Sequence, residues 1–455
     1  MKKTLLYAVL LTSLMGNAQC WKSVSAGSLS ALGIKMDDTL WSWGYAGWGG
    51  LGNGDTTTDV ATPQQVGTAT NWKNVYTGTN QYFAIKYDLT LWAWGSNNNG
   101  QLGINSTTAI ISEPTQVGTQ LWKMVASGSD HSIGIRNNGT LWGWGDNSEG
   151  AIGDGTLMNK PYPVLINSST NWKMVSCNND TNIALKNDGT IWAWGNNNAS
   201  LGLGGANYSA PNVKVPTQVG TDTDWKYIAA GFGRILALKT DNTLWAWGSG
   251  YIGPESGYTT FSHFPMQISS ETDWDSIQIS TQSAFGLKLD GTFRVWGNNN
   301  GGQLGNGTTN SIGVPTEVIY NYDWKAISSK GAYTLALLTD GSMYSWGNNY
   351  YGTLGNGDLG TDQYQPQLVN NCSLSTDKFN KNKINSYPNP VQNSLFIDAD
   401  ETQSYELYSI LGSKISEGTL SVGNSIDCSN LTSGVYLLNL TDDLGNVSNV
   451  KFVKD

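Results

Sequence analysis

Residues 172–195 read WKMVSCNNDTNIALKNDGTIWAWG, and this stretch decides the fold. A Trp opens one strand, and a β-branched Val follows three residues later, as a buried strand prefers. Asp188-Gly189 is typical of a tight hairpin turn, because such a turn needs the positive φ that glycine adopts easily. The next strand reads Trp-Ala-Trp, and since side chains alternate along a strand, both Trp point to one face. The stretch therefore predicts short β-strands joined by a hairpin.

The same pattern recurs seven times at a spacing of about 50 residues, which indicates a repeat architecture. The Trp that open the seven copies are Trp21, Trp72, Trp122, Trp172, Trp225, Trp274 and Trp324. A closing Trp, always followed by Gly, lies 22 residues later in each copy, at Trp43, Trp94, Trp144, Trp194, Trp247, Trp296 and Trp346. Five copies add a third Trp two residues before the closing one, at Trp41, Trp92, Trp142, Trp192 and Trp245. Of the 20 Trp in the chain, only Trp48 breaks this register.

A fourth strand follows in every copy, marked by Pro with Val or Ile three residues later, from Pro63 and Val66 to Pro366 and Val369. Pro is tolerated at the first residue of an edge strand. Seven units with four short strands each predict an all-β fold, a seven-bladed β-propeller over residues 19–372.

The two ends of this array suggest how the ring closes. The last Pro strand has no Trp strand after it, and the strand at Trp21 has no Pro strand before it. We therefore expect the C-terminal strand to complete the first blade, because an open edge would invite aggregation. This closure would bring Cys20 and Cys372 together, so we predict a disulfide across the seam, with two unpaired thiols as the alternative. In theory, closing a loop of that length adds about 5 kcal/mol to stability.

The N-terminus has the features of a secretory signal: Lys2 and Lys3, an apolar run over residues 5–15, and small residues at Gly16 and Ala18. Residues 1–18 are predicted to be a signal peptide that is cleaved after Ala18. The apolar run is too short to span a bilayer, and no later segment is suitable, so we expect no membrane-spanning segment. Export also permits disulfides.

The charge pattern excludes several classes of protein. The net charge is −10, and only 13% of the residues are charged. No stretch forms a basic patch, which argues against nucleic-acid binding through phosphate neutralisation and against a polybasic membrane contact. A disordered tail or a charge-rich coiled coil would need far more charge.

Residues 94–103, WGSNNNGQLG, and 128–150, GSDHSIGIRNNGTLWGWGDNSEG, resemble the repeat of the regulator of chromosome condensation family. That repeat is similar in having Gly-x-x-His-Ser, then Asp-Gly, then Trp-Gly-x-Asn-x-x-Gly-Gln-Leu-Gly. The resemblance covers residues 21–369 and implies a seven-bladed propeller. Founding members of the family are nuclear exchange factors for a small GTPase, and the export signal and acidity of this chain argue against that activity. What remains implied is a disc whose loops bind a partner.

The sequence changes character after Cys372. Trp disappears, residues 373–386 are polar and predict a linker, and alternating apolar segments over residues 387–455 predict a small C-terminal β-sandwich. This tail resembles the C-terminal sorting domain of type IX secretion substrates, with its Asn389-Pro390 start, its Ser433–Tyr436 strand and its Lys-containing end. The resemblance implies contact with the type IX secretion machinery, and a secreted protein or one on the outer-membrane surface of a Bacteroidota-type bacterium. An ordinary accessory β domain is the alternative.

No catalytic motif is visible in the sequence. The chain has two His, His131 and His263, and neither has a Cys or His at ligand spacing. Nucleophile-elbow and phosphate-loop motifs are also missing. The Gly-Asn-Gly-Asp turns at Asp55 and Asp358 could hold calcium but more often are plain turns. We therefore expect no metal, no cofactor, no catalytic residues and no enzymatic activity.

The residues that break the repeat are the candidates for function. The ring should bring four aromatic residues to one rim: Tyr45, Trp48, Tyr350 and Tyr351. Repeat five is irregular and offers a second candidate patch: Tyr251, Tyr258, Phe261 and Phe264. Aromatic side chains on the loops of a rigid scaffold stack on sugars or anchor protein partners.

These residues predict a monomeric binding propeller that recognises a protein or a glycan through loops on one face. Two alternatives remain open. The rings could simply pack on the blade edges, or the protein could be a secreted hydrolase whose carboxylates converge at the propeller channel.

Overall fold

The computed structural model describes residues 20–106, 108–197, 201–204, 211–250, 261–320, 322–370, 386–387, 390–397, 403–409, 413–421, 425–441 and 447–455. They belong to two compact units, one within Gln19–Cys372 and one within Ser373–Asp455. The predicted signal peptide and nearly all of the predicted linker lie outside the described residues. Within the described parts, every regular element is a strand except the short 3₁₀ turn η1 (Gly47–Gly49), and no helix could cross a membrane.

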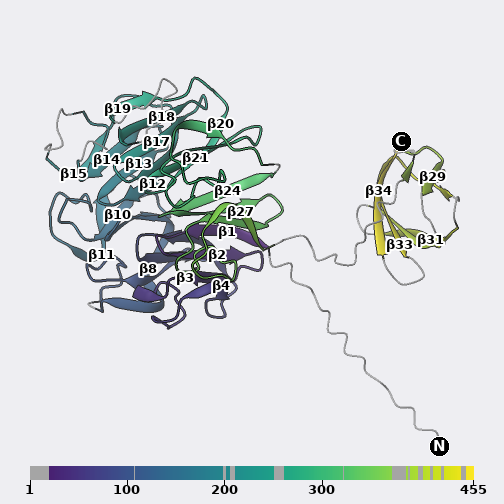
Figure 1. Cartoon of the computed structure of the whole chain (residues 1–455), viewed down its shortest axis with the longest axis horizontal. Coiled ribbons are helices and arrows are strands. Elements are labelled where there is room, and N and C mark those ends of the chain that lie inside the picture. Colours follow the sequence, from purple (N-terminus) through teal and green to yellow (C-terminus); the bar gives the residue numbers. More distant parts are fainter. Residues whose placement is uncertain are drawn as a thin grey trace, which may run out of the picture. The chain divides into compact units, whose positions relative to one another are not determined.

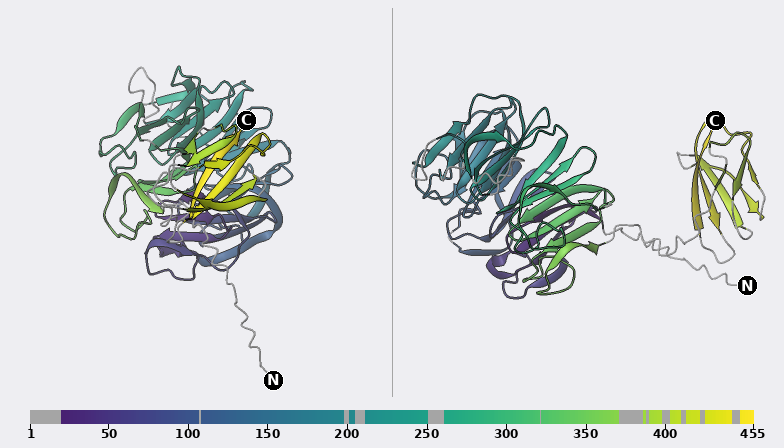
Figure 2. Two further views of the ribbon diagram at one scale, coloured as in Figure 1. Left: turned by 90° about the vertical axis from the view of Figure 1, so that its right-hand side faces the viewer. Right: turned by 45° about the horizontal axis from the view of Figure 1, so that its top comes forward.

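The first unit is the predicted seven-bladed propeller (Figure 1, Figure 2). The first strands of the blades are β1 (Trp21–Ala26), β5 (Trp72–Thr77), the second part of β8 (Ile110–Ser127), β12 (Trp172–Asn178), β16 (Trp225–Gly231), β20 (Trp274–Ile279) and β24 (Trp324–Lys330). The second strands are β2 (Ser30–Lys35), β6 (Gln81–Lys86), β9 (His131–Arg136), β13 (Thr181–Lys186), β17 (Arg234–Lys239), β21 (Ser283–Lys288) and β25 (Tyr333–Leu338).

The third strands carry the closing Trp: β3 (Leu40–Gly44), β7 (Thr90–Ser96), β10 (Leu141–Gly145), β14 (Ile191–Gly195), β18 (Leu244–Ser249), β22 (Phe293–Gly297) and β26 (Met343–Gly347). The fourth strands carry the Pro: β4 (Val60–Gln65), the first part of β8, β11 (Lys160–Asn167), β15 (Val213–Gln218), β19 (Phe261–Gln267), β23 (Ile312–Glu317) and β27 (Gln363–Asn370). Blades two and three form one seven-stranded sheet because β8 serves both, and the other five blades are separate four-stranded sheets.

The first strands are the innermost ones. Each contacts the first strand of the next blade, and the circle is completed by β24 against β1. The colours of Figure 1 run from purple to green around this ring, so that β1 lies beside β24 and β27. The chain order of the blades is therefore also their order in space.

The closing Trp joins each blade to the one before it. The ring of Trp94 is buried, and its indole N–H donates to the carbonyl oxygen of Gly50 in the preceding blade at 3.1 Å. Gly52, with φ of 67°, lies against the same ring, and a Cβ there would be 2.9 Å from Nε1. Only glycine fits both the backbone and the space. This contact explains why Gly-x-Leu-Gly and Trp-Gly recur together.

The third Trp has a structural role that its spacing did not reveal. A cation at the end of the second strand lies over its ring, as Lys35 lies 3.3 Å from the centroid of Trp41. The indole N–H of Trp41 donates to the hydroxyl of Thr39 at 2.7 Å. The same arrangement recurs at Trp92, Trp142, Trp192 and Trp245. Cation–π contacts of this kind contribute roughly 0.5–2 kcal/mol each.

We expected the C-terminal strand to complete the first blade, and this expectation was wrong. The strand β27 pairs with β26, and β1 pairs with β2, so no strand of the described residues crosses from one blade to the other. Every blade consists of four strands that are consecutive in sequence. The physical reason is that the Pro strand pairs with the Trp-Gly strand that precedes it, so the first blade already has its Pro strand in β4.

Side chains and single hydrogen bonds close the ring instead. The indole of Trp43 donates to the carbonyl oxygen of Thr353 at 2.9 Å, as the indoles of Trp94, Trp144, Trp194 and Trp346 donate to the blade before theirs. The amide of Trp21 donates to the carbonyl oxygen of Gly341 at 3.0 Å. A buried cluster that includes Trp43, Tyr333 and Leu354 fills the interface between the two blades.

The second unit is a small β-sandwich, as predicted. One sheet contains β28 (Ser386–Tyr387), β29 (Ser394–Ile397) and β32 (Ser425–Asp427). The other contains β31 (Lys414–Leu420), β30 (Gln403–Ser409), β33 (Gly434–Thr441) and β34 (Val447–Lys454). Its core draws on both sheets and includes Leu395, Leu438 and Phe452, and the free thiol of Cys428 is buried in it.

Candidate functional site

The loops of the propeller emerge on two faces, and the candidate residues that the structure describes lie on one of them. We call this the loop face: it contains the turns between first and second strands and the long loops between third and fourth strands. These segments share a face because the four strands of a blade alternate in direction. The amide of Tyr45 donates to the carbonyl oxygen of Leu29 at 3.0 Å, which ties one kind of segment to the other.

Three of the four predicted rim residues are in contact. We call Tyr45, Trp48, Tyr350 and Tyr351 the aromatic rim. The ring centroids of Tyr45 and Tyr351 lie 4.6 Å apart across the seam. Those of Tyr350 and Tyr351 lie 4.7 Å apart in a T-shaped arrangement. Tyr45 and Tyr351 are half-buried, so part of the rim does pack on the blade edges, whereas Tyr350 is 69% exposed.

The same positions meet in another interface, where they are polar. Glu149 lies five residues after its closing Trp, as Tyr351 does, and Asn196 lies two residues after its own, as Tyr45 does. The side-chain amide of Asn196 donates to the Glu149 carboxylate at 3.2 Å. The position five residues after one closing Trp therefore contacts the position two residues after the closing Trp of the next blade. This contact is polar between Glu149 and Asn196, and it is aromatic between Tyr351 and Tyr45 at the seam.

Trp48 lies at the interface between the first and second blades, next to the seam. The adjoining Gly49 packs against the backbone of Ile111 and Ser112 in β8, so this loop faces the second blade. The Trp48 backbone has φ of 60° and ψ of 13°, a left-handed conformation, and its side chain is 42% exposed. A bulky residue at positive φ costs on the order of 1–3 kcal/mol, and such strain gathers at functional sites.

The second predicted patch is only partly described. Tyr251 and Tyr258 lie outside the described residues. The ring of Phe261 packs edge-on against His263, with centroids 4.0 Å apart. Phe264 is 62% exposed, but its ring covers Gly204 of the preceding blade, where a Cβ would lie 2.7 Å from Cζ. These contacts give Phe264 a packing role between blades.

His131 is structural. It is buried, and its Nε2 lies 2.7 Å from the side-chain oxygen of Asn182 in the next blade. Burial is the main cause that lowers the pKa of His131. The imidazole is therefore neutral at pH 7 and joins two blades.

The Asp-rich turns have ordinary turn contacts. The carboxylate of Asp55 accepts hydrogen bonds from the backbone and hydroxyl of Thr57, and the carbonyl oxygen of Asp358 accepts one from the side-chain amide of Asn349 at 2.9 Å. Among the residues that the structure describes, no group of three His, Cys, Asp or Glu could hold a metal ion.

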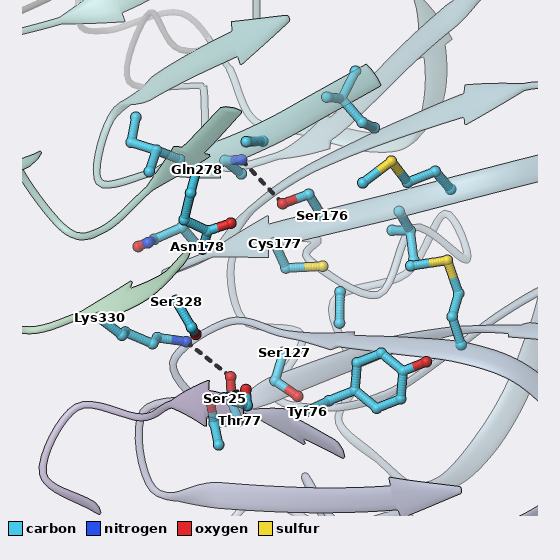
Figure 3. A pocket seen from close by; sticks show the side chains of 18 of the residues that line it. Ser25, Tyr76, Thr77, Ser127, Ser176, Cys177, Asn178, Gln278, Ser328 and Lys330 are labelled. Carbon is cyan, nitrogen blue, oxygen red and sulfur yellow. Dashed lines mark hydrogen bonds between the residues drawn. The ribbon is translucent and has the colours of Figure 1, made fainter. Parts of the chain in front are cut away.

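The central channel contains a cavity of about 210 Å³ at its loop-face end (Figure 3). All seven first strands contribute to its wall, which includes Ser25, Thr77, Asn178, Gln278 and Lys330. None of the described residues that line it is Asp or Glu. The ammonium of Lys330 donates to the carbonyl oxygen of Thr77 at 3.3 Å. Burial lowers the pKa of Lys330 to about 8, against the opposing effect of Cys177.

Sequence reasoning missed Lys330, although a signal was present. The sixth residue after the opening Trp is Gly in four repeats, Asn in one and Ser in one: Gly27, Gly78, Gly128, Asn178, Gly231 and Ser280. Lys330 is the large, charged exception. Cys177 lines the same cavity as a buried free thiol, and burial raises its pKa.

The seam disulfide stays a prediction. Cys20 is disulfide-bonded, and Cys177 and Cys428 are free thiols. The predicted partner, Cys372, lies outside the described residues.

Known protein families match both units of the chain. A model of the regulator of chromosome condensation (RCC1) repeat matches residues 90–135, 138–185, 290–337 and 340–379, and a second model of this repeat matches 123–151, 173–200 and 324–353. A secretion system C-terminal sorting domain matches residues 385–455. The chain therefore has RCC1 repeats followed by a sorting domain, as both resemblances predicted.

Sequence relatives cover only a part of the chain. The protein RCC2 homolog of Xenopus laevis is 32% identical over 100 residues, which are 21% of this chain and 19% of that protein. Protein RCC2 of Mus musculus is 33% identical over 100 residues, with the same coverage. This chain thus spans about a fifth of the length of these relatives.

Solved structures show the same fold. Human WBSCR16 superposes with a TM-score of 0.65 at 21% identity, covering 73% of this chain and 94% of that chain. Prp20p of Saccharomyces cerevisiae, reported with its binding to Gsp1p and histones, gives a TM-score of 0.65 at 20% identity, covering 82% and 90%. At such identities the likeness shows the propeller fold alone.

Proposed function

Because RCC1 repeats precede a secretion sorting domain in this chain, we propose that it is an exported, monomeric binding propeller of a Bacteroidota-type bacterium. The sorting domain would engage the type IX secretion machinery. The propeller would be released or held at the cell surface, where its aromatic rim would dock a protein partner.

The conformation of Trp48 is the observation that carries this proposal. Its side chain is 42% exposed, and its backbone is held at positive φ. Neither feature stabilises the fold, since exposure forgoes burial and the backbone is strained. The amide of Ala46 donates to the Asp59 carboxylate at 2.9 Å and fixes the start of this loop. The loop thus presents a large ring in a defined position.

The composition of the rim supports a protein partner. Trp and Tyr are the residues most enriched among those that dominate protein–protein binding energy. Leu359, in the loop that follows Tyr351, is 56% exposed and extends the apolar surface beside Gly352. Prp20p shares the fold and is reported to bind proteins, which supports the general mode but not the partner.

A glycan is the second candidate ligand. The largely exposed ring of Tyr350 offers a face for sugar stacking. The side-chain amide of Asn348 lies beside it, where its oxygen accepts the amide of Tyr350 at 3.2 Å. A ring next to an amide suits a sugar hydroxyl. The hydrolase alternative gains no support from the channel wall, where the described residues include no carboxylate.

Capture experiments with the mature full-length chain test the proposal. Surface proteins from neighbouring bacterial and host cells would be cross-linked to the purified protein, and a glycan array would be run in parallel. We expect Trp48→Ala combined with Tyr350→Ala to abolish capture of a specific protein. Tyr162→Ala, which removes a 51% exposed tyrosine on β11, is the matched control and should have no effect. Array binding that depends on the rim would favour a glycan, and ligands unaffected by the double variant would refute the rim.

A further inference from the structure

Lys330 occupies a position where the other six repeats have Gly, Asn or Ser. It ends β24 in the seventh blade, and its side chain extends past the first blade to Thr77 on β5 in the second (Figure 3). Hydrogen bonds between neighbouring first strands hold this part of the wall. Ser25 and Thr77 hydroxyls lie 2.9 Å apart, and the hydroxyl of Ser328 accepts the amide of Ala26 at 2.9 Å.

The ammonium of Lys330 has unused hydrogen-bonding capacity. A lysine ammonium has three N–H donors, and among the described residues it reaches one acceptor, the carbonyl oxygen of Thr77 at 3.3 Å. It forms no ion pair within the described parts of the chain. Asn178 and Gln278 line the same cavity, and the structure shows no hydrogen bond from either side-chain amide to another described residue. Three side chains thus offer free N–H donors to one cavity.

The cavity has the dimensions of a small-molecule fragment. Its volume is about 210 Å³, which corresponds to roughly seven water molecules at about 30 Å³ each. One cation, neutral amides and hydroxyls, and no carboxylate in the described wall together suit a small anion.

We propose that the loop-face end of the central channel binds a small monocarboxylate, held by Lys330 together with the amides of Asn178 and Gln278. One ammonium neutralises one negative charge. A doubly charged sulfate or phosphate would leave a net charge in a partly buried site, which is costly. Asp130 and Asp180, in the turns after β8 and β12 on the same face, would further disfavour a second negative charge.

Ligand binding should depend on the protonation of Lys330. Its pKa, about 8 because of burial, makes binding strong below pH 8 and weak above it. Besides Lys330, the titratable groups among the described residues that line the cavity are Tyr76, Cys177 and Tyr227, and burial raises the pKa of each. His131, behind β8, has a lowered pKa. These four groups are therefore neutral on both sides of pH 8 and do not compete with Lys330.

Calorimetric titration of the mature full-length protein with propionate tests this site. Sulfate and the neutral isostere propionamide are titrated in parallel. We expect saturable propionate binding at pH 6.5 that weakens at least tenfold at pH 9.5, and no saturable binding of the other two probes. Equal binding of propionamide, tighter binding of sulfate, or an affinity that does not change with pH would overturn the proposal.

Variants of Lys330 locate the site. Lys330→Met keeps the apolar stem and removes the charge, and Lys330→Gly installs the residue that four other repeats have, so both should fold. Each should abolish propionate binding, whereas Lys123→Met, which removes an exposed lysine on β8, should leave it intact. Propionate binding that survives in both Lys330 variants would refute the site.

The carboxylate site does not rest on the proposed docking function. Trp48→Ala with Tyr350→Ala should retain full propionate binding. Loss of macromolecular capture with retained propionate binding would therefore concern the rim alone, and the reverse result would concern the channel alone.

Discussion

The ring of Tyr351, in the last blade, packs on the ring of Tyr45, in the first blade, with their centroids 4.6 Å apart. The pair spans the seam of the propeller on its loop face. It therefore joins the closure of the ring to the surface that we propose for binding. A change at this pair should alter both stability and recognition.

Tyr351→Leu should lower the free energy of unfolding by about 0.5–1.5 kcal/mol, since the variant keeps apolar volume but loses the aromatic pairing. Tyr350→Leu is the control, because Tyr350 is mostly exposed and its ring pairs with that of Tyr351 within one blade and not across the seam. Chemical denaturation followed by Trp fluorescence measures both. Equal losses in the two variants would mean that the contact across the seam adds nothing.

Gly355→Ala should destabilise the propeller by about 2–4 kcal/mol, through backbone strain and a steric clash together. Gly355 has φ of 70°, and a Cβ there would lie 2.9 Å from Nε1 of the buried Trp43. Gly360→Ala, in the same blade, is a matched control: φ is 93°, but the Cβ would meet nothing within 4 Å. The difference between the two unfolding midpoints measures the effect of the clash. Equal midpoints would show that the ring of Trp43 can shift to accommodate the new Cβ without a loss of stability.

A disulfide between Cys20 and Cys372 should appear in non-reducing peptide mapping by mass spectrometry. The backbone places the two ends of the propeller at one hairpin: Trp21 bonds to Gly341, and Asn370 pairs with Met343 in the same hairpin. Cys177 and Cys428, both free and buried, are internal controls that should become labelled only after unfolding. Reduction should lower the thermal midpoint. Free thiol at Cys372 in the native protein would contradict this pairing.

Stability should fall in acid because turn carboxylates are stabilised as anions in the folded state. Hydrogen bonds from Thr190 hold the pKa of Asp188 below its ordinary value of 3.8, and Thr90 and Thr243 act likewise on Asp88 and Asp241. A lowered folded-state pKa contributes stability that is complete above the unfolded-state value and is lost as pH falls through the folded-state one. We therefore expect the unfolding midpoint to drop as pH falls below 3.8.

Asp188→Asn tests the source of this acid sensitivity. Blade three already has Asn138 at the same turn position, where its side-chain oxygen accepts the amide and the hydroxyl of Thr140 at 3.2 and 2.7 Å. The variant should keep neutral-pH stability within about 0.5 kcal/mol and show a shallower loss in acid. An unchanged acid profile would place the sensitivity elsewhere.

Most of the fold could be predicted because it is periodic. Each of the seven copies repeats the opening and closing Trp, the hairpin turn and the Pro strand. This pattern predicts the four strands of every blade. The grouping into blades was harder, since spacing along the chain does not say whether Pro366 pairs with the strand before it or with Trp21. That choice depends on hydrogen bonds between strands, which the structure supplies.

The site was less predictable than the fold. The repeat break at Trp48, Tyr350 and Tyr351 is visible by alignment of the copies, because neighbouring copies become neighbouring blades. The geometry that separates Trp48 from the three tyrosines is not visible in this way. Lys330 also breaks the repeat. The sequence does not show that the first strands line the channel, so it does not indicate that this lysine lies in a cavity.

Each blade is one uninterrupted piece of chain, and the ring closes without exchange of a strand. The seam is therefore equivalent to the other interfaces between blades. In principle, the present ends of the propeller could be joined and new termini opened in a loop between two other blades. A whole blade is likewise a unit that gene duplication can add or remove. Each blade is thus a contiguous module of the sequence, and the interface with the Tyr45–Tyr351 pair is the one at which the chain of the propeller begins and ends.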